Sequence, residues 1–407
     1  MQSAPVKGLL NGMVDRLAAA TAFRVWLASR VLCWAVGVGA ILVFGAHAGV
    51  HDRFGLTTPF GSLGNTLVGP AARWDTVWYV LIADHGYVNR LTTEFYPLYP
   101  LLARAVGTPF GSSLLGGLAV SLVGFFAGLY FLYRLTALEL GRDLARRATY
   151  LVGFFPTAVF FSAVYTEGLF LGLTVGAFYS ARRGRWAWAG VLGGLASATR
   201  TVGIVLLVPL VLLYAYGPRD DRPPGETWGG RLRLRYRLRP DVLWLALVPV
   251  GLACWWTYLI VRFGSPLVSA EQHSTWSQTF TFPLVTVWRA TLLAGTGLLR
   301  VLHGHAPDNV YQYTLFLLAC AATVGALRRL PLAYGAYAAV SLLFIISFPV
   351  SGSHLAIFSR YLAPIFPLAV WLAAWSSERR WFRGVLIVSA LMMVVDSARF
   401  ATWHFHG

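Results

Sequence analysis

Charged residues are scarce in this 407-residue sequence. Asp, Glu, Lys and Arg together make up only 12% of the chain, whereas a soluble domain carries roughly a quarter. Apolar residues reach 57%, and the mean hydropathy is +0.62. Apolar runs close to the ~20 residues that cross a bilayer recur along the whole length. The composition therefore predicts an all-α, polytopic integral membrane protein, because such runs are too long and too uniformly apolar for barrel strands.

Lysine, cysteine and several common motifs are also rare or missing. Lys7 is the only lysine, a bias that favours a high-GC genome and so a bacterial source. Cys33, Cys254 and Cys320 lie far apart in apolar runs, so they form neither a metal-ligand pattern nor a disulfide framework. The chain contains no G-x-x-x-x-G-K-[ST] loop, no G-x-S-x-G turn and no H-E-x-x-H. Direct nucleotide hydrolysis is therefore not expected.

We expect no required metal and no other cofactor. Asp75 and Asp84 are nine residues apart, which places them on opposite faces of a continuous helix and makes them a poor pair of metal ligands.

The formal net charge of +17 could suggest a nucleic-acid partner, but its distribution argues against one. The arginines gather in short stretches between apolar runs: Arg134–Arg147, Arg182–Arg185, Arg219–Arg239, Arg328–Arg329 and Arg379–Arg383. Cytoplasmic loops carry such an excess of basic residues in membrane proteins. The pattern therefore predicts contact with the membrane and no binding of nucleic acid.

Placing the basic stretches inside gives a single transmembrane domain over residues 1–407 with about eleven spans. The predicted spans are 25–48, 113–134, two hairpins at 149–181 and 186–217, then 241–261, 310–327, 331–350, 359–376 and 384–402. Segments 49–112 and 262–309 are predicted outside and 218–240 inside. The turns of the hairpins fall near Thr166 and Arg200. Because each arm is short for a full span, these helices are expected to be broken or sheltered by protein.

The first outer segment is rich in aromatic residues. A helix from Trp74 would line up Trp74 and Trp78 on one stripe, and Asp75 and Tyr79 on another. Indole and phenol rings favour the headgroup level, so an interfacial helix is predicted there. An interfacial anchor without chemistry would account equally well for the aromatic residues alone.

Polar residues on the predicted outer side favour a reaction site. Asp75, Glu167 and Arg200 join Arg360 and Tyr361 on that side. Arginine binds phosphate through paired charge-assisted hydrogen bonds, and a carboxylate can deprotonate a hydroxyl. We therefore expect Asp75 to be the catalytic base and Arg360, with Arg200, to bind the donor phosphate. The structural alternative is a set of Asp–Arg pairs that pin the loops, such as Asp75 with neighbouring Arg73 or another outer arginine.

Further side chains on the same side are predicted to bind substrate. This set comprises Trp74, Tyr79, Glu94, Glu167, His273, His354 and Tyr361. Glu94 and Glu167 are also the next candidates for the base if Asp75 is not.

Four ordered stretches resemble the PIG-V-type mannosyltransferase family. Residues 74–87, WDTVWYVLIADHGY, resemble its W-D-x-x-x-[FY]-x-x-I-A-x-x-G-Y signature. Residues 160–167, FFSAVYTE, resemble F-F-S-A-x-Y-[ST]-E, and Ala198-Thr199-Arg200 with Gly203 resembles A-T-R-x-x-G. Residues 360–367, RYLAPIFP, resemble R-Y-x-x-P-x-F-P. One departure is Phe155-Pro156, where eukaryotic members usually have Asn-Pro, and it leaves the acceptor open.

The resemblance implies a GT-C-type helical bundle with interfacial helices in its outer loops. It implies an inverting enzyme that moves mannose from a polyprenyl-phosphate carrier to a lipid or glycolipid acceptor on the outer face of a membrane, here a bacterial plasma membrane. An acidic residue of the first outer loop is the expected base, which corresponds to Asp75.

A transporter or flippase of a lipid-linked sugar is the alternative. The halves of the chain show no inverted hydropathy repeat, and the polar residues gather at one face instead of the midplane where transport sites lie.

Overall fold

The computed structural model describes residues 4–46, 52, 54–222, 235–272, 279–301, 308–350 and 354–404. Every regular element within these ranges is helical, which confirms the all-α prediction. The longer helices are α1 (Ala4–Phe44), α5 (Ser113–Leu140), α7 (Glu167–Arg182), α12 (Pro283–Val301), α13 (Asp308–Arg329) and α17 (Phe382–Ala401). The shorter ones in the bundle are α6 (Arg142–Gly153), α8 (Trp186–Ser197), α9 (Leu207–Tyr216), α10 (Val250–Phe263), α14 (Leu332–Ser347) and α16 (Phe366–Glu378).

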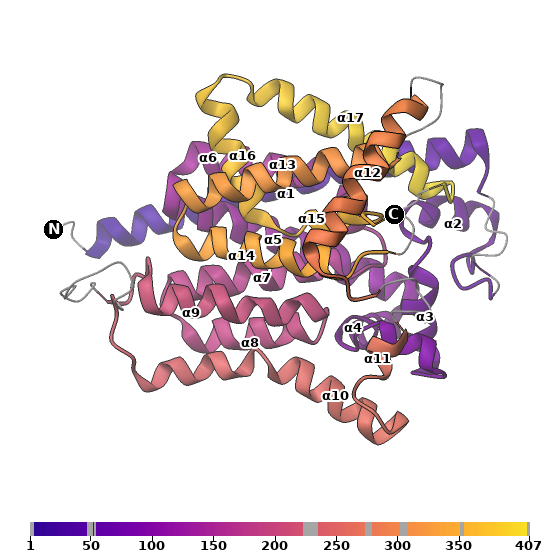
Figure 1. Cartoon of the computed structure of the whole chain (residues 1–407), viewed down its shortest axis with the longest axis horizontal. Helices are drawn as coiled ribbons and strands as arrows, with labels where there is room; N and C mark the ends of the chain where they lie inside the picture. Colours follow the sequence, from indigo (N-terminus) through magenta and orange to yellow (C-terminus); the bar gives the residue numbers. More distant parts are fainter. Residues whose placement is uncertain are drawn as a thin grey trace.

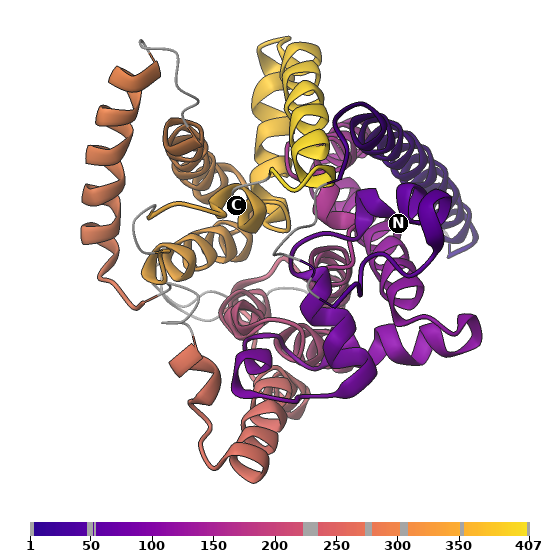
Figure 2. The same ribbon diagram turned by 90° about the vertical axis from the view of Figure 1, so that its right-hand side faces the viewer.

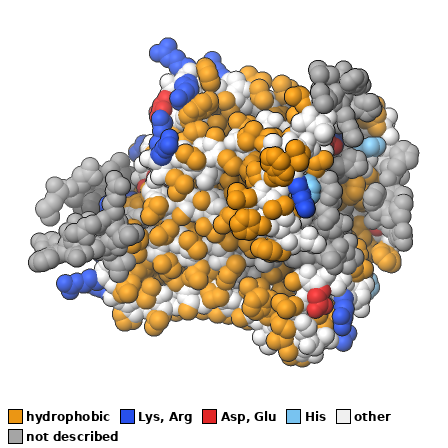
Figure 3. All heavy atoms as spheres, viewed as in Figure 1, with side chains coloured by type: hydrophobic (Ala, Val, Ile, Leu, Met, Phe, Trp, Pro, Cys, Tyr) orange, Lys and Arg blue, Asp and Glu red, His pale blue; other side chains and the backbone are white. Residues whose placement is uncertain are grey.

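The bundle helices run side by side, with the first outer segment at one end (Figures 1 and 2). That segment contains α2 (Gly61–Val68), α3 (Thr76–His85) and α4 (Leu98–Gly107), and its 3-10 turns are Gly69–Ala71, Arg90–Glu94 and Thr108–Phe110. The small α11 (Val268–Gln272) lies beside it in both views. In Figure 3, a broad apolar flank separates the basic side chains near the N-terminus from a smaller group of charged side chains at the other end.

The predicted membrane character is confirmed, but the count of eleven spans is not. Four helices among the described residues are long and apolar enough to cross a bilayer: Gly12–Phe44 within α1, and α5, α13 and α17. A fifth span is possible if the 3-10 helix Pro240–Leu247 and α10, which meet at a bend of 42°, count as one. Apolar helices such as α14 are too short to meet the same length criterion.

The first predicted hairpin differs from a simple pair of helices. Helix α6 ends at Gly153 and α7 begins at Glu167, and turns with one 3-10 helix (Ala158–Phe161) fill the interval. Pro156 explains the break, because proline lacks a backbone N–H and disfavours helical geometry in the residue before it. The interval is mostly buried, as irregular backbone at membrane depth must be.

Arg30 of α1 helps to satisfy this buried backbone. Its Nη1 donates hydrogen bonds to the Ala158 carbonyl at 2.7 Å and to Ser162 Oγ at 2.6 Å, and the guanidinium lies 4.8 Å from the centre of the Phe125 ring. The second hairpin breaks where the sequence predicts, since α8 ends at Ser197 and the 3-10 helix Thr201–Leu206 leads into α9.

The second predicted outer segment contains a long helix. Helix α12 has 19 residues and lies at the outer edge of the molecule in Figure 2, where it contacts α13 and α14. Its Leu284 and Trp288 are 70% and 64% exposed, so this element presents apolar side chains outward.

The basic stretches meet one another at one end of the bundle. Arg182 binds Glu139 of α5 at 2.7 Å and also contacts Asp220 of the 218–240 segment. Arg147 of α6 donates to Ser377 Oγ of α16 at 2.9 Å. The end of α16 in turn binds the end of α13 through Glu378 and Arg329, at 2.6 Å.

Cysteine labelling can test the orientation. We expect Ser62→Cys, on exposed α2, to react with an impermeant thiol reagent in intact cells, and Arg237→Cys, in the basic segment, to react only after lysis. Both would be made in a protein whose three native cysteines, all unpaired, are replaced by alanine. Equal labelling of the two sites in intact cells would contradict the predicted topology.

Candidate active site

Four charged residues that are distant in sequence form one cluster. Arg360, in the short helix α15 (Phe358–Leu362), donates from Nη1 to Asp75 Oδ2 at 2.7 Å and from Nε to Glu167 Oε1 at 2.5 Å. Arg200 donates from Nη1 to the same Glu167 oxygen at 2.7 Å, and to Thr166 Oγ1 at 3.3 Å. Two cations and two carboxylates thus lie in direct contact.

Three of the four members, Asp75, Glu167 and Arg200, stand at a break or an end of a helix. Asp75 immediately precedes α3, Glu167 is the first residue of α7, and Arg200 precedes the 3-10 helix Thr201–Leu206. Backbone interrupted at these points can turn the side chains toward a common centre, which uninterrupted helices would not allow.

The backbone around Asp75 is fixed by contacts with the segment before α7. Its N–H donates to Tyr165 Oη at 2.9 Å, and Val164 N–H donates to the Ala71 carbonyl at 2.9 Å. Trp74 has a positive φ of 54°, which is uncommon for a bulky residue. The Asp75 carboxylate makes no capping hydrogen bond to α3. It is held by Arg360 instead, so its position is set by a distant segment.

The two carboxylates differ in access. Glu167 is fully buried, and its Oε2 accepts no hydrogen bond from the described residues. Such a buried, unpartnered acceptor is costly. The Asp75 side chain is 26% exposed. Asp75 is therefore the more accessible of the two carboxylates, whereas burial closes off Glu167.

Aromatic rings hold the arginines in place. The Arg360 guanidinium carbon lies 4.5 Å from the centre of the Tyr165 ring and 5.1 Å from that of Phe160. The Arg200 guanidinium lies 5.0 Å from the centre of the Tyr361 ring. These contacts are in the range of favourable cation–π interactions, and they place Tyr361 beside the cluster.

Trp74 and Tyr79 lie close to the charge cluster or to the aromatic residues that pack against it. Tyr79 is buried, with its ring centre 4.9 Å from that of Tyr99 and 6.1 Å from that of Tyr165. Burial, with smaller contributions from Glu167 and Asp75, raises the pKa of the Tyr79 phenol. Trp74 packs its ring 5.4 Å from Trp403, just beyond the end of α17. Both are therefore in a position to shape the site.

Other predicted residues are placed elsewhere or fall outside the described ranges. Glu94 ends a 3-10 helix and is half-buried. It lies near Tyr96, whose pKa is raised to about 12. Burial is the main cause, the charge of Glu94 adds to it, and a hydrogen bond with Thr201 opposes it. Partial burial and the charge of Arg289 in α12 lower the pKa of His354. His354 therefore lies near α12. His273 lies outside the described residues.

Arg73 is not the partner of Asp75. Its Nε donates to the Ala401 carbonyl at 2.8 Å, and burial lowers the pKa of Arg73 to about 10. Tyr165 and Arg30 are supporting residues that the sequence predictions did not single out. Arg30 carried a usable signal, because an arginine inside a long apolar run is expected to have a specific partner.

The sequence profile of the family described as Mannosyltransferase (PIG-V) matches residues 56–212. Over these residues the chain is similar to the PIG-V-type mannosyltransferase family. Three members of the cluster, Asp75, Glu167 and Arg200, lie within the matched residues, and Arg360 lies beyond them. The family resemblance and most of the charge cluster thus occupy the same part of the chain.

Two similar proteins come from eukaryotes. GPI alpha-1,6-mannosyltransferase 2 of Cricetulus griseus is 36% identical over 152 residues, which cover 34% of this chain and 30% of that protein. GPI mannosyltransferase 2 of Cryptococcus neoformans is 29% identical over 186 residues, which cover 42% and 43% of the two chains. The chain therefore spans less than half of the length of these relatives.

Among solved structures, an oligosaccharyltransferase of Archaeoglobus fulgidus is similar with a TM-score of 0.43 and 15% identity. The similarity covers 79% of this chain and 48% of that one.

Proposed function

We propose that this chain is an inverting mannosyltransferase that moves mannose from a polyprenyl-phosphate-mannose donor to a lipid or glycolipid acceptor. The proposed site faces outward from a bacterial plasma membrane. The charge cluster is the observation that carries the proposal, because it joins an accessible carboxylate to an arginine that can bind phosphate. The similarity of residues 56–212 to PIG-V-type mannosyltransferases supports the choice of mannose.

Asp75 is the proposed general base. The acceptor hydroxyl loses its proton to the Asp75 carboxylate as its oxygen forms a bond to the anomeric carbon of mannose. The bond from that carbon to the donor phosphate oxygen breaks, and the polyprenyl phosphate leaves with the electron pair. Attack from the side opposite the leaving group inverts the anomeric centre. A hydroxyl is a poor nucleophile at neutral pH, so a positioned base is needed.

Arg360 is proposed to bind the donor phosphate, with Arg200 beside it. Before substrate arrives, the Arg360 guanidinium is shared by Asp75 and Glu167. A donor phosphate that binds Arg360 would compete with Asp75 for the guanidinium. The weakened ion pair would leave the Asp75 carboxylate freer to accept the hydroxyl proton, while Glu167 keeps both arginines aligned. Substrate binding and activation of the base would then be linked.

The position of the site agrees with a lipid-borne donor. Trp74, which precedes Asp75 in the chain, packs its ring at a tilt against that of Trp403, and tryptophan favours the headgroup region. The basic loops lie at the other end of the bundle, where α17 begins. Because α17 has 20 residues, it spans about 30 Å, close to the thickness of the hydrocarbon core. This separation supports a site at the leaflet opposite the basic loops.

The donor assay is the test of this proposal. We expect purified protein in detergent to transfer mannose from polyprenyl-phosphate-mannose to at least one member of a panel of lipid acceptors. GDP-mannose alone should give no product, because the sequence has no nucleotide-phosphate loop.

Direct transfer from GDP-mannose, free of any carrier-charging enzyme, would contradict the proposed donor. Absence of product from every sugar donor, together with movement of the lipid-linked sugar across proteoliposomes, would favour a transporter instead. Protein carrying Asp75→Asn, prepared in parallel, controls for a contaminating transferase.

A further inference from the structure

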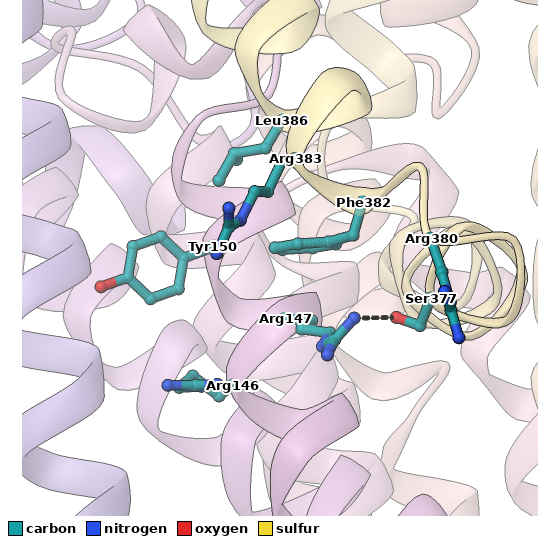
Figure 4. Close-up of a pocket in the computed structure, with 8 residues that line it drawn as sticks. All are labelled: Arg146, Arg147, Tyr150, Ser377, Arg380, Phe382, Arg383 and Leu386. Atoms are coloured by element: carbon teal, nitrogen blue, oxygen red, sulfur yellow. Dashed lines mark hydrogen bonds between the residues drawn. The ribbon is translucent and has the colours of Figure 1, made fainter.

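A basic pocket lies at the end of the bundle where the predicted cytoplasmic loops meet, between α6 and the turn that joins α16 to α17 (Figure 4). Its volume is about 560 Å³. Four arginines line it: Arg146, Arg147, Arg380 and Arg383. The transfer mechanism proposed above does not use this pocket, which is on the far side of the molecule from Asp75.

The arginines of the pocket are not neutralised by carboxylates. No acidic residue lines the pocket, and the ion pairs formed among the described residues include none of these four arginines. Glu378, which is close in sequence, is instead bound to Arg329. Like charges held together repel one another, so an anion would be favoured here.

One arginine is already oriented for such a ligand. The Arg147 guanidinium donates to Ser377 Oγ at 2.9 Å and lies 5.1 Å from the centre of the Phe382 ring. Figure 4 shows the Phe382 ring between the side chains of Arg383 and Arg147, with the hydrogen bond from Arg147 to Ser377 drawn as a dashed line. Guanidinium groups fixed in this way suit the oxygens of a phosphate group.

The apolar side of the pocket indicates that the phosphate belongs to a lipid. Leu386 lines the pocket, and the outward face of α17 continues from it through Ile387, Leu391 and Val395, which are 59%, 60% and 55% exposed. Trp381, at the start of this face, is 59% exposed, as expected of an aromatic residue at the membrane interface. A ligand with acyl chains can follow this face into the bilayer, which free phosphate cannot.

We propose that this pocket binds the phosphate headgroup of an anionic phospholipid, whose acyl chains lie along the outward face of α17. Basic pockets between helices on the cytoplasmic side are suited to such headgroups. The lipid belongs to the leaflet opposite the one assigned to the mannose donor, because the pocket and Trp74 lie at opposite ends of α17. The site is therefore separate from substrate binding.

The test measures lipid binding to purified full-length protein in an uncharged detergent. The ligands are short-chain phosphatidylglycerol, short-chain phosphatidylcholine and inorganic phosphate, and isothermal titration calorimetry gives each Kd. The wild-type protein should bind phosphatidylglycerol roughly tenfold or more tightly than either of the others, since only that ligand combines a net negative charge with acyl chains.

A double variant identifies the pocket. Arg146→Gln with Arg383→Gln removes two exposed arginines of the pocket and should weaken phosphatidylglycerol binding by about tenfold or more. Arg237→Gln with Arg328→Gln removes two exposed arginines elsewhere and should change the Kd less than twofold. Both double variants should keep the wild-type melting temperature, because these side chains are exposed.

Three results would overturn the proposal. Equal binding of the two lipids would remove the requirement for an anionic headgroup. Inorganic phosphate that binds as tightly as phosphatidylglycerol would make free phosphate the ligand. Unchanged phosphatidylglycerol binding in the Arg146 and Arg383 double variant would place the lipid elsewhere. The first two comparisons use wild-type protein, so they stand even if the variant folds poorly.

Discussion

Replacing Asp75 with asparagine is expected to lower the turnover of mannose transfer by about a hundredfold or more. The amide has nearly the same shape and can still accept a hydrogen bond from Arg360, but it cannot take up the proton of the acceptor hydroxyl. Donor binding and the yield of folded protein should be retained. Initial rates with saturating polyprenyl-phosphate-mannose, together with a donor-binding measurement, separate these quantities.

Asp308 provides a matched control for this experiment. Its carboxylate accepts two hydrogen bonds of 3.0 Å from Arg399, and its side chain is 36% exposed. Asp308→Asn therefore weakens a comparable ion pair outside the cluster and should leave turnover per folded molecule close to that of the wild type. If Asp75 only served to anchor Arg360, both substitutions would reduce the folded yield and spare turnover. A well-folded and fully active Asp75→Asn protein would transfer the role of base to Glu94 or Glu167.

The sequence predicted which polar residues converge, but not how they pair. Asp75, Arg200, Arg360 and Tyr361 were expected on one face, and the structure brings them together around Glu167. Of the arginine partners that the structural alternative allowed for Asp75, Arg73 turns to the Ala401 carbonyl, whereas Arg360, another arginine of the predicted outer side, forms the ion pair. Neighbours in sequence point in different directions at the start of a helix, so proximity along the chain was a poor guide.

Hydropathy also could not distinguish helical from irregular backbone inside the bundle. Residues 154–166 are as apolar as the helices around them, yet they form turns because Pro156 interrupts the helix and Arg30 binds the carbonyl of Ala158. Arg30, which stabilises this irregular backbone, is more than a hundred residues away in the sequence. The same effect explains why several short helices were counted as full spans and why the count of eleven is not confirmed.

His354 shows the remaining limit of the sequence predictions. It is only six residues from Arg360, but its electrostatic neighbour is Arg289 of α12. No pattern in the sequence predicts that a long helix of the second outer segment approaches this turn. Its assignment to substrate binding therefore stays a prediction.

Replacing Arg360 with lysine is expected to lower turnover strongly, although the positive charge is retained. The guanidinium donates to Asp75 from Nη1 and to Glu167 from Nε. The lysine ammonium has a single nitrogen and cannot make both hydrogen bonds in this planar geometry. Loss of a charge-assisted contact that strengthens as the phosphate leaves costs roughly 2–4 kcal/mol in the transition state. The expected loss in turnover is therefore about thirtyfold to a thousandfold.

Arg360→Lys is more informative than Arg360→Ala because of what surrounds the side chain. Alanine would leave the fully buried Glu167 with Arg200 as its remaining ion-pair partner, and breaking a buried ion pair can cost about 3–5 kcal/mol of folding free energy. Arg399→Lys, which alters the pair with Asp308, controls for a general effect of exchanging arginine for lysine. A catalytic role predicts that only Arg360→Lys lowers turnover in protein that melts at the wild-type temperature. Near-wild-type turnover in folded Arg360→Lys would instead make Arg360 a structural bridge between two carboxylates, and Arg200 would then be the candidate for the donor phosphate.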